Sequence, residues 1–166
     1  MGLALLLLRL GTFESSMYSE MDSTVKKGNF LQLFSSAATF KKYLYCILMG
    51  LPIWYIIGIL VFSAPEISKL VGIDGKISGG DAIMFCYLGL ALGDFASGAL
   101  SQWFKSRGKA VLTYLFIAVG ICVYYLFGMS DITTTHAYLM ITLLGFFGGY
   151  WAVFLTFSSE QFGTNV

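Results

Sequence analysis

One carboxylate stands inside an otherwise apolar stretch of this 166-residue chain. Asp94 is the only charged residue between Ala82 and Phe104. A charged side chain in the middle of a membrane span costs about 2.5–3.5 kcal/mol on insertion scales, so it normally faces a helix bundle or a water-filled path. Two interpretations are open: Asp94 takes up a proton or contacts a substrate, or it makes a structural hydrogen bond or ion pair between helices.

Small residues surround Asp94 at helical spacing. One set recurs every four residues and predicts a ridge for close packing against another helix: Gly89, Gly93, Ser97 and Ser101. Asp94 shares the adjoining face with Gly98 and Ser101, and Tyr87 lies two turns earlier. The pattern therefore places Asp94 toward the interior of a bundle.

Two further groups combine aromatic side chains with helix-breaking residues. Trp54 and Tyr55 follow Pro52, which in a transmembrane helix produces a kink and frees a backbone carbonyl. Tyr150 and Trp151 follow a glycine-rich stretch and lie past the centre of their apolar run, away from the span ends where aromatic belts gather. Each group suits either a movable element that lines a cavity or ordinary close packing.

The remaining reactive residue types point to no catalytic or metal-binding chemistry. Cys46, Cys86 and Cys122 fall inside apolar runs without metal-ligand spacing, which is typical of small buried hydrophobic residues. No hydrolase, zinc-protease or phosphate-loop motif occurs, so we expect neither an enzyme nor a bound cofactor or metal. The single histidine, His136, is expected in a solvated loop. A net charge of +1 offers no electrostatic basis for binding nucleic acid.

These residues lie on long apolar segments. Hydrophobic residues make up 57% of the chain and charged residues only 11%, against roughly 25% charged residues in a soluble domain. Four stretches reach the ~20 apolar residues that a spanning helix needs: 44–63, 82–104, 110–129 and 137–157. Asp81 is a candidate N-cap for the second stretch. The sequence predicts an all-α integral membrane bundle, in which successive helices are antiparallel neighbours.

Basic residues are distributed unevenly between the two ends of these spans. Seven of them precede the first span or lie between the second and third: Lys26, Lys27, Lys41, Lys42, Lys105, Arg107 and Lys109. The loops at the other end contain only Lys69 and Lys76. Because positively charged loops stay in the cytoplasm, we expect a multi-pass protein of the cell (inner) membrane with both chain ends cytoplasmic. Glu160 follows the fourth span and is expected to pair with Lys105 or Arg107.

The start of the chain differs from the four-span bundle expected over residues 44–166. Residues 2–8 are strongly apolar but too short to span a bilayer, so residues 1–11 are interpreted as the end of a transmembrane helix whose beginning is missing. Residues 12–43 form a mixed polar segment with apolar residues at roughly helical spacing between lysine pairs. This segment is either a helix lying on the inner membrane surface or an ordinary cytoplasmic linker.

The segment from Gly98 to Lys109, GALSQWFKSRGK, resembles a repeated cytoplasmic motif of the major facilitator superfamily of secondary transporters. That motif, Gly-x-Leu-Ala-Asp-Arg-x-Gly-Arg-Lys/Arg, joins the second and third helices of each half of those proteins, and the segment lies in the same place. Gln102 replaces the acidic residue and Lys105 replaces the second glycine. Such decay is usual in the second half of these proteins, so the resemblance favours a C-terminal half.

The segment from Ser159 to Val166, SEQFGTNV, resembles the signature Glu-x-Phe-Pro-Thr-x-Val-Arg that follows the tenth helix of the same family, with Gly163 in place of the proline. On this alignment, residues 1–11 resemble the end of helix six, residues 12–43 the central linker, and the four spans helices seven to ten. The chain is then a fragment of a proton-coupled or facilitative carrier. It would need its missing half, or a second copy, to enclose a cavity.

The resemblance implies transport of a small solute across the bilayer by alternating access. It implies a substrate cavity lined by Trp54, Tyr55, Tyr87, Asp94, Tyr150 and Trp151. Within this cavity Asp94 would be the proton-coupling group or would bind a cationic or hydroxyl-bearing solute. The cytoplasmic gate would comprise Gly98, Gln102, Lys105, Arg107 and Glu160. The alternative is a small non-transporting membrane subunit, derived from a transporter, with a structural or assembly role in a larger complex.

Overall fold

Helices make up the architecture of the chain in a computed structural model, which describes residues 33–73, 75–128 and 133–162. In chain order they are α3 (Ala37–Tyr55), the π-helix η2 (Ile56–Val61), α4 (Ala64–Val71), α5 (Gly79–Trp103), α6 (Arg107–Phe127), α7 (Thr134–Gly148) and α8 (Trp151–Glu160). No strand is present within these three ranges.

Four helical segments in the described part of the chain are long and apolar enough to cross a membrane, as the sequence predicted. They are Ala37–Val61, Gly79–Trp103, Arg107–Phe127 and Thr134–Glu160. The first segment joins α3 to η2, and the fourth combines α7 and α8. The described chain is therefore an all-α bundle of the multi-pass membrane type.

The first span begins earlier than its apolar run. Ser36 is the N-cap of α3, and its hydroxyl accepts a hydrogen bond from the N–H of Ala38 at 3.3 Å. Residues 37–43 consequently belong to the spanning helix, not to the separate linker or surface helix expected over 12–43. The expectations for residues 1–32 lie outside the described residues.

Serine caps the second span, so the expectation that Asp81 is its N-cap is wrong. Ser78 is the N-cap of α5, and its hydroxyl accepts a hydrogen bond from the N–H of Asp81 at 3.4 Å. Asp81 lies in the first turn, where a negative charge still favours the helix N-terminus. Ser106 caps α6 in the same way, because its hydroxyl accepts from the N–H of Lys109 at 3.4 Å.

A short helix that the sequence did not indicate, α4, follows the first span. Pro65 lies in its first turn, where the missing N–H costs no helical hydrogen bond. Gly72 ends the helix with φ of +76°, a backbone conformation that favours glycine. α4 contacts η2, α5 and α6, and so packs across one end of the bundle.

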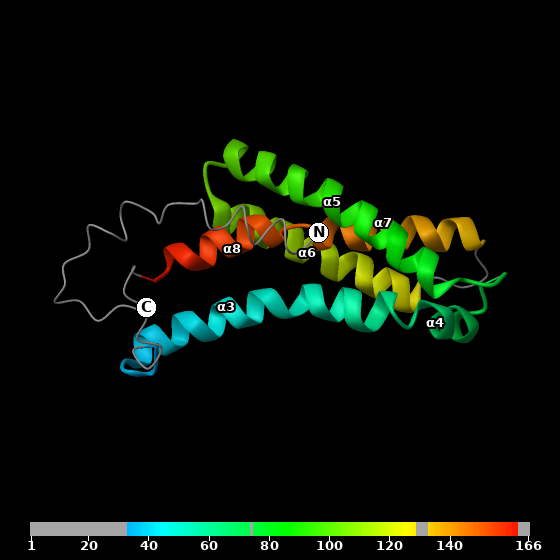
Figure 1. Cartoon of the computed structure of the whole chain (residues 1–166), viewed down its shortest axis with the longest axis horizontal. Helices are drawn as coiled ribbons and strands as arrows, with labels where there is room; N and C mark the ends of the chain where they lie inside the picture. Colours follow the sequence, from blue (N-terminus) through cyan, green and yellow to red (C-terminus); the bar gives the residue numbers. More distant parts are fainter. Residues whose placement is uncertain (1–32, 74, 129–132, 163–166) are drawn as a thin grey trace, which may run out of the picture.

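The long helices run side by side along the long axis of the molecule (Figure 1). α7 contacts α5, α6 and η2, and α8 contacts α3, α5 and α6, so the fourth span lies at the centre of the bundle. The start of α3, the α5–α6 turn and the end of α8 share one end, which we call the basic end. α4 and the start of α7 lie at the opposite end, so successive spans are antiparallel, as predicted.

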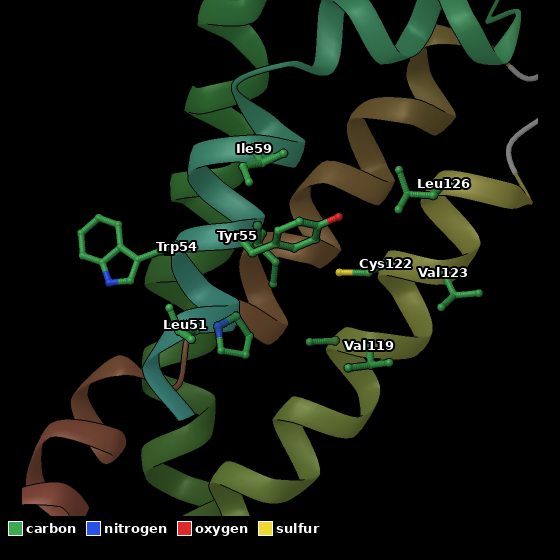
Figure 2. Close-up of a pocket in the computed structure, with 11 residues that line it drawn as sticks. Leu51, Trp54, Tyr55, Ile59, Val119, Cys122, Val123 and Leu126 are labelled. Atoms are coloured by element: carbon green, nitrogen blue, oxygen red, sulfur yellow. The ribbon is translucent and has the colours of Figure 1, made fainter. Parts of the chain in front are cut away.

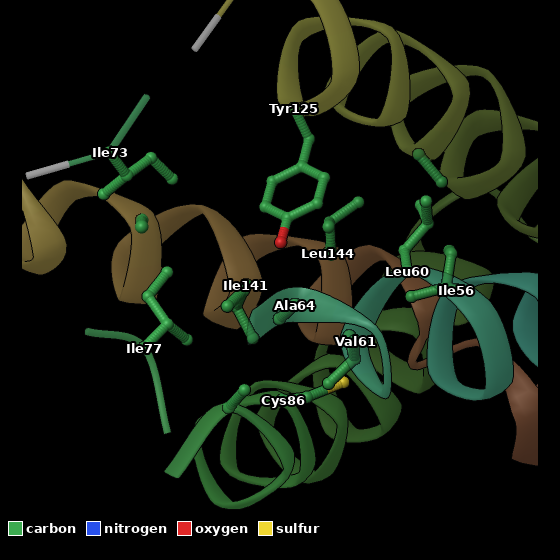
Figure 3. Packing of buried hydrophobic residues seen from close by; sticks show 13 residues of the cluster. Ile56, Leu60, Val61, Ala64, Ile73, Ile77, Cys86, Tyr125, Ile141 and Leu144 are labelled. Atoms are coloured by element: carbon green, nitrogen blue, oxygen red, sulfur yellow. The ribbon is translucent and has the colours of Figure 1, made fainter. Parts of the chain in front are cut away.

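Buried apolar side chains join the first span to the fourth away from the basic end. Ile56, Leu60 and Val61 of η2 belong to one cluster with Ile141 and Leu144 of α7 (Figure 3). Each of these five side chains is at most 1% exposed. The π-helical end of the first span is therefore held against α7 by close packing.

α5 and α7 approach each other closely because glycines line their contact. A Cβ atom on Gly93 would overlap the carbonyl oxygen of Phe146, and a Cβ atom on Gly145 would overlap that of Cys86. Buried positions of the predicted small-residue ridge on α5 are Gly89, Gly93 and Ser97. This ridge is thus confirmed as a helix-packing surface, and Ser101 lies partly exposed near its end.

Candidate functional site

The fourth span is interrupted where α7 gives way to α8. α7 ends at Gly148, and α8 starts at Trp151 after Gly149 and Tyr150. Gly149 packs so closely on α5 that a Cβ atom there would lie 2.5 Å from the carbonyl oxygen of Leu90. The break gives α8 an N-terminus inside the bundle, beside the middle of α5.

The side chain of Asp94, on α5, lies at the N-terminus of α8. The backbone N–H of Ala152, in the first turn of α8, donates to Oδ1 of Asp94 at 3.3 Å. A carboxylate is favoured at this place because the unpaired N–H groups and the helix dipole present partial positive charge. The Asp94 side chain is partly exposed. The hydrogen bond between helices, one of the two interpretations of Asp94, is present.

Two buried tyrosines connect the surroundings of the break to other helices. The hydroxyl of Tyr150 donates to the carbonyl of Met49 on α3 at 2.7 Å. The hydroxyl of Tyr114 on α6 donates to the carbonyl of Gly93 at 3.3 Å. Tyr150 has no exposed surface, so it packs between the first and fourth spans and does not face an open cavity.

Two tryptophans lie together at the start of α8. The rings of Trp54 and Trp151 meet edge to face, with centroids 6.0 Å apart. Trp54 remains 62% exposed, and Trp151 also packs against Phe154. Trp151 directly precedes the residue that donates to Asp94, so the tryptophan pair and Asp94 both lie at the start of α8.

Tyr55 and Tyr87 do not join this group. Tyr55 lines a groove between α3 and α6, and its ring points toward Cys122 (Figure 2). Trp54 also borders this groove, although its ring points away from α6 (Figure 2). Tyr87 is exposed on α5, seven residues before Asp94, a separation of about 10 Å along the helix. With Tyr150 fully buried, the six residues expected to line one cavity therefore fall into four environments.

The residues of the expected cytoplasmic gate lie at the basic end. Arg107 and Glu160 form an ion pair between the start of α6 and the end of α8, as expected, and their side chains are 43% and 56% exposed. Gln102 is exposed near the end of α5, and no atom of another segment approaches the position that a Cβ of Gly98 would take. The ion pair therefore joins the α5–α6 turn to the end of the fourth span.

Lys105 has an unusual backbone conformation, with φ of +50°. The N–H groups of Lys105 and Ser106 donate to the carbonyls of Gln102 and Ser101 at 3.1 and 3.2 Å. This is the Schellman pattern of a helix C-terminus, in which the left-handed residue is usually glycine. Lys105 therefore lies at a position whose left-handed backbone favours glycine, and glycine is the residue that the motif has there.

Two groups at the site were not predicted from the sequence. Met49 accepts a hydrogen bond through its backbone carbonyl, which its side-chain type does not reveal. Tyr114 is one of several tyrosines in apolar spans, and the sequence does not distinguish it from the others.

His136 lies in the first turns of α7 and not in a solvated loop, and within the described residues its Nε2 atom is buried without a hydrogen-bond partner. The expectation for His136 is therefore corrected.

The described residues hold no group of three or more His, Cys, Asp and Glu side chains placed to bind a metal ion. Comparison with known proteins adds no relative: no family model, no curated protein and no solved structure matches the chain.

Proposed function

We propose that this chain is part of a secondary transporter of the major facilitator type, which moves a small solute across the cell membrane by alternating access. The observation that carries the proposal is the broken fourth span, with Asp94 at the N-terminus of α8. Discontinuous transmembrane helices with charged groups at their half-helix ends are typical of substrate and ion sites in secondary transporters. A proton or cationic solute bound at Asp94 would compete directly with the start of α8.

The α5–α6 turn supports the same proposal. Its sequence resembles the cytoplasmic motif of the family, and Lys105 adopts the left-handed conformation at the position of the motif's second glycine. The Arg107–Glu160 ion pair joins this turn to the end of α8. Opening the basic end in a transport cycle would require this exposed pair to separate, at a cost of about 0.2–1 kcal/mol.

In the proposed cycle Asp94 is the coupling group. Its charged form is attracted to the N-terminus of α8, an interaction worth about 0.3–1 kcal/mol at exposed sites and up to about 2 kcal/mol in partly buried ones. Protonation removes this attraction and lets α8 shift relative to α5. Trp54 and Trp151 form the aromatic wall beside Asp94, against which a solute would bind.

The basic end faces the cytoplasm in this proposal, because it holds Lys41, Lys42, Lys105, Arg107 and Lys109, whereas Lys69 and Lys76 belong to the opposite end. The proposed partners are the lipid bilayer, another transporter half or a second copy, and the small solute.

Replacing Asp94 by Asn tests the proposal, because Asn keeps an acceptor oxygen for Ala152 and removes the charge. The full-length protein is reconstituted in liposomes that contain the pH-sensitive dye pyranine. Proton influx is recorded after addition of neutral, cationic and anionic solutes in turn. We expect solute-dependent influx with the native protein, and influx no greater than that of empty liposomes with Asp94→Asn.

Two control variants distinguish a loss of proton coupling from a loss of folding stability. Asp81→Asn removes an exposed carboxylate at the start of the same helix and should leave the influx unchanged. Asp94→Ala removes the acceptor as well as the charge and should lower the free energy of unfolding by about 1 kcal/mol, the usual effect of losing an N-cap. Unchanged influx and pH dependence in Asp94→Asn contradict the coupling role. A native protein without solute-dependent flux would favour the non-transporting subunit.

A further inference from the structure

A groove runs along the bundle between α3 and α6, with α8 also lining it at the basic end, and continues past η2. It consists of two cavities of about 410 and 770 Å³, which meet at Pro52. The smaller cavity, which we call the basic-end groove, has Lys42 and Gln161 at its mouth and Leu48, Pro52, Leu115 and Phe157 along its walls. It therefore has polar residues at the basic end, which we call its mouth, and apolar side chains along the rest of its length.

The length of the basic-end groove matches one leaflet of a bilayer. Lys42 and Pro52 are ten residues apart on α3, which corresponds to about 15 Å along a helix that rises 1.5 Å per residue. The hydrocarbon core of a bilayer is about 30 Å thick, so one leaflet contributes about half of that. With Lys42 at the membrane interface, Pro52 lies close to the middle of the bilayer.

No carboxylate of the described residues pairs with the positive charge at the mouth of the groove. Lys42 is exposed, and in the described ranges it has no carboxylate within ion-pair distance. Lys41 lies beside it, with its Nζ atom 5.7 Å from the centroid of the Tyr45 ring. Glu160, near the same mouth, is already paired with Arg107.

We propose that the basic-end groove binds an anionic phospholipid from the leaflet at the basic end. The phosphate lies at Lys41 and Lys42, and one acyl chain follows Leu48 and Leu115 toward Pro52. Basic pockets between transmembrane helices bind anionic headgroups in this way. A free phosphate ion would use the mouth alone and would leave the apolar walls of the groove unoccupied. The proposal does not depend on transport, since Trp54 does not line the basic-end groove and Asp94 lines neither of the two cavities.

Native mass spectrometry of the full-length protein tests the proposal. The protein is purified in detergent with equal amounts of dioleoyl phosphatidylglycerol and dioleoyl phosphatidylcholine, which differ only in the headgroup. We expect one retained phosphatidylglycerol and a clear preference over phosphatidylcholine. Lys42→Gln should lower the occupancy by phosphatidylglycerol about fivefold, the effect of one lysine near an anionic surface. Lys69→Gln, at the opposite end, should change nothing.

A second pair of variants tests the apolar part of the groove. Leu48 is half exposed, so Leu48→Trp fills the groove without disturbing the core and should lower the occupancy by both lipids. Leu44→Trp, on an exposed position of the same helix outside the groove, is the matched control. The melting temperature of each variant checks that it folds. Equal retention of the two lipids, retention of neither, full retention in Lys42→Gln and Leu48→Trp, or an equal loss in Lys69→Gln would overturn the proposal.

Discussion

Several side-chain hydroxyls in the described spans donate to backbone carbonyls, whereas the buried hydroxyls of Tyr125 and Ser158 have no partner among the described residues. Ser97 donates to the carbonyl of Asp94 and Thr142 to that of Tyr138, both within one helix. Tyr114 and Tyr150 instead donate to carbonyls of a neighbouring helix. A polar group inside a bilayer has no water to bond, so each hydrogen bond within the protein avoids the cost of an unsatisfied donor. The two tyrosines therefore fix the positions of helices as well as their own hydroxyls.

At the same scale, Gly93 is needed because a helix backbone lies directly against it. We expect Gly93→Ala to lower the free energy of unfolding by about 1–3 kcal/mol, because the new methyl group would overlap the carbonyl oxygen of Phe146 and force α5 and α7 apart. Thermal unfolding in detergent, followed by circular dichroism, measures the effect.

Gly98→Ala is the matched control on the same helix. Nothing lies within 4 Å of the Cβ position there, so the substitution should be neutral or should stabilise α5 by about 0.5–1 kcal/mol through its higher helix propensity. Equal effects of the two substitutions would show that the close approach of α5 and α7 is not present in the folded protein.

At the scale of elements, the turn between α5 and α6 combines tight geometry with an unfavourable residue. Its two Schellman hydrogen bonds require a left-handed residue, and Lys105 takes that conformation although it has a Cβ atom. A left-handed conformation costs a residue with a side chain about 1–2 kcal/mol. The turn is therefore stabilised by its hydrogen bonds and by the Ser106 cap in spite of Lys105.

Lys105→Gly should consequently raise the free energy of unfolding by about 0.5–1 kcal/mol, since glycine takes this conformation freely but loses more entropy on folding. Lys105→Ala removes the same charge without relieving the backbone and should leave the stability nearly unchanged. The melting temperatures of the two variants distinguish the effect of the backbone conformation from the effect of the charge. A greater stabilisation by Ala than by Gly would assign the effect to the lost charge.

At the scale of the whole molecule, the two ends of the bundle differ in charge, and the proposed orientation follows from that difference. We expect Lys76→Cys to react with a membrane-impermeant maleimide on intact cells, and Lys105→Cys to react only after the cells are permeabilised. Both are exposed, and the background protein has Cys46, Cys86 and Cys122 replaced by Ala.

Lys69→Cys and Lys109→Cys serve as second reporters for the same two ends. The reverse labelling pattern would contradict the orientation alone. Labelling of both ends from the same side would contradict the crossing of the membrane by the second span.

The spans were predictable, whereas the break in the fourth span was not. A run of about 20 apolar residues identifies a span without any knowledge of its neighbours. Gly148 and Gly149 are equally compatible with a continuous helix, because glycine is frequent in transmembrane helices. Contacts of Gly149 with Leu90 and Asp94 accompany the break, and these belong to another helix. For the same reason the sequence could place Asp94 in the interior but could not show that it caps α8.

The break also constrains the order in which the chain can be assembled in the membrane. When the fourth span enters the bilayer, the first N–H groups of α8 have no preceding turn to bond, and hydrocarbon offers no substitute. The partner observed for Ala152 is Asp94, which arrives with the second span. Stable insertion of the fourth span therefore depends on a second span already in place. The hydrogen bond between Ala152 and Asp94 also lowers the cost of placing a carboxylate in the bilayer. Each of these two segments thus completes the membrane integration of the other.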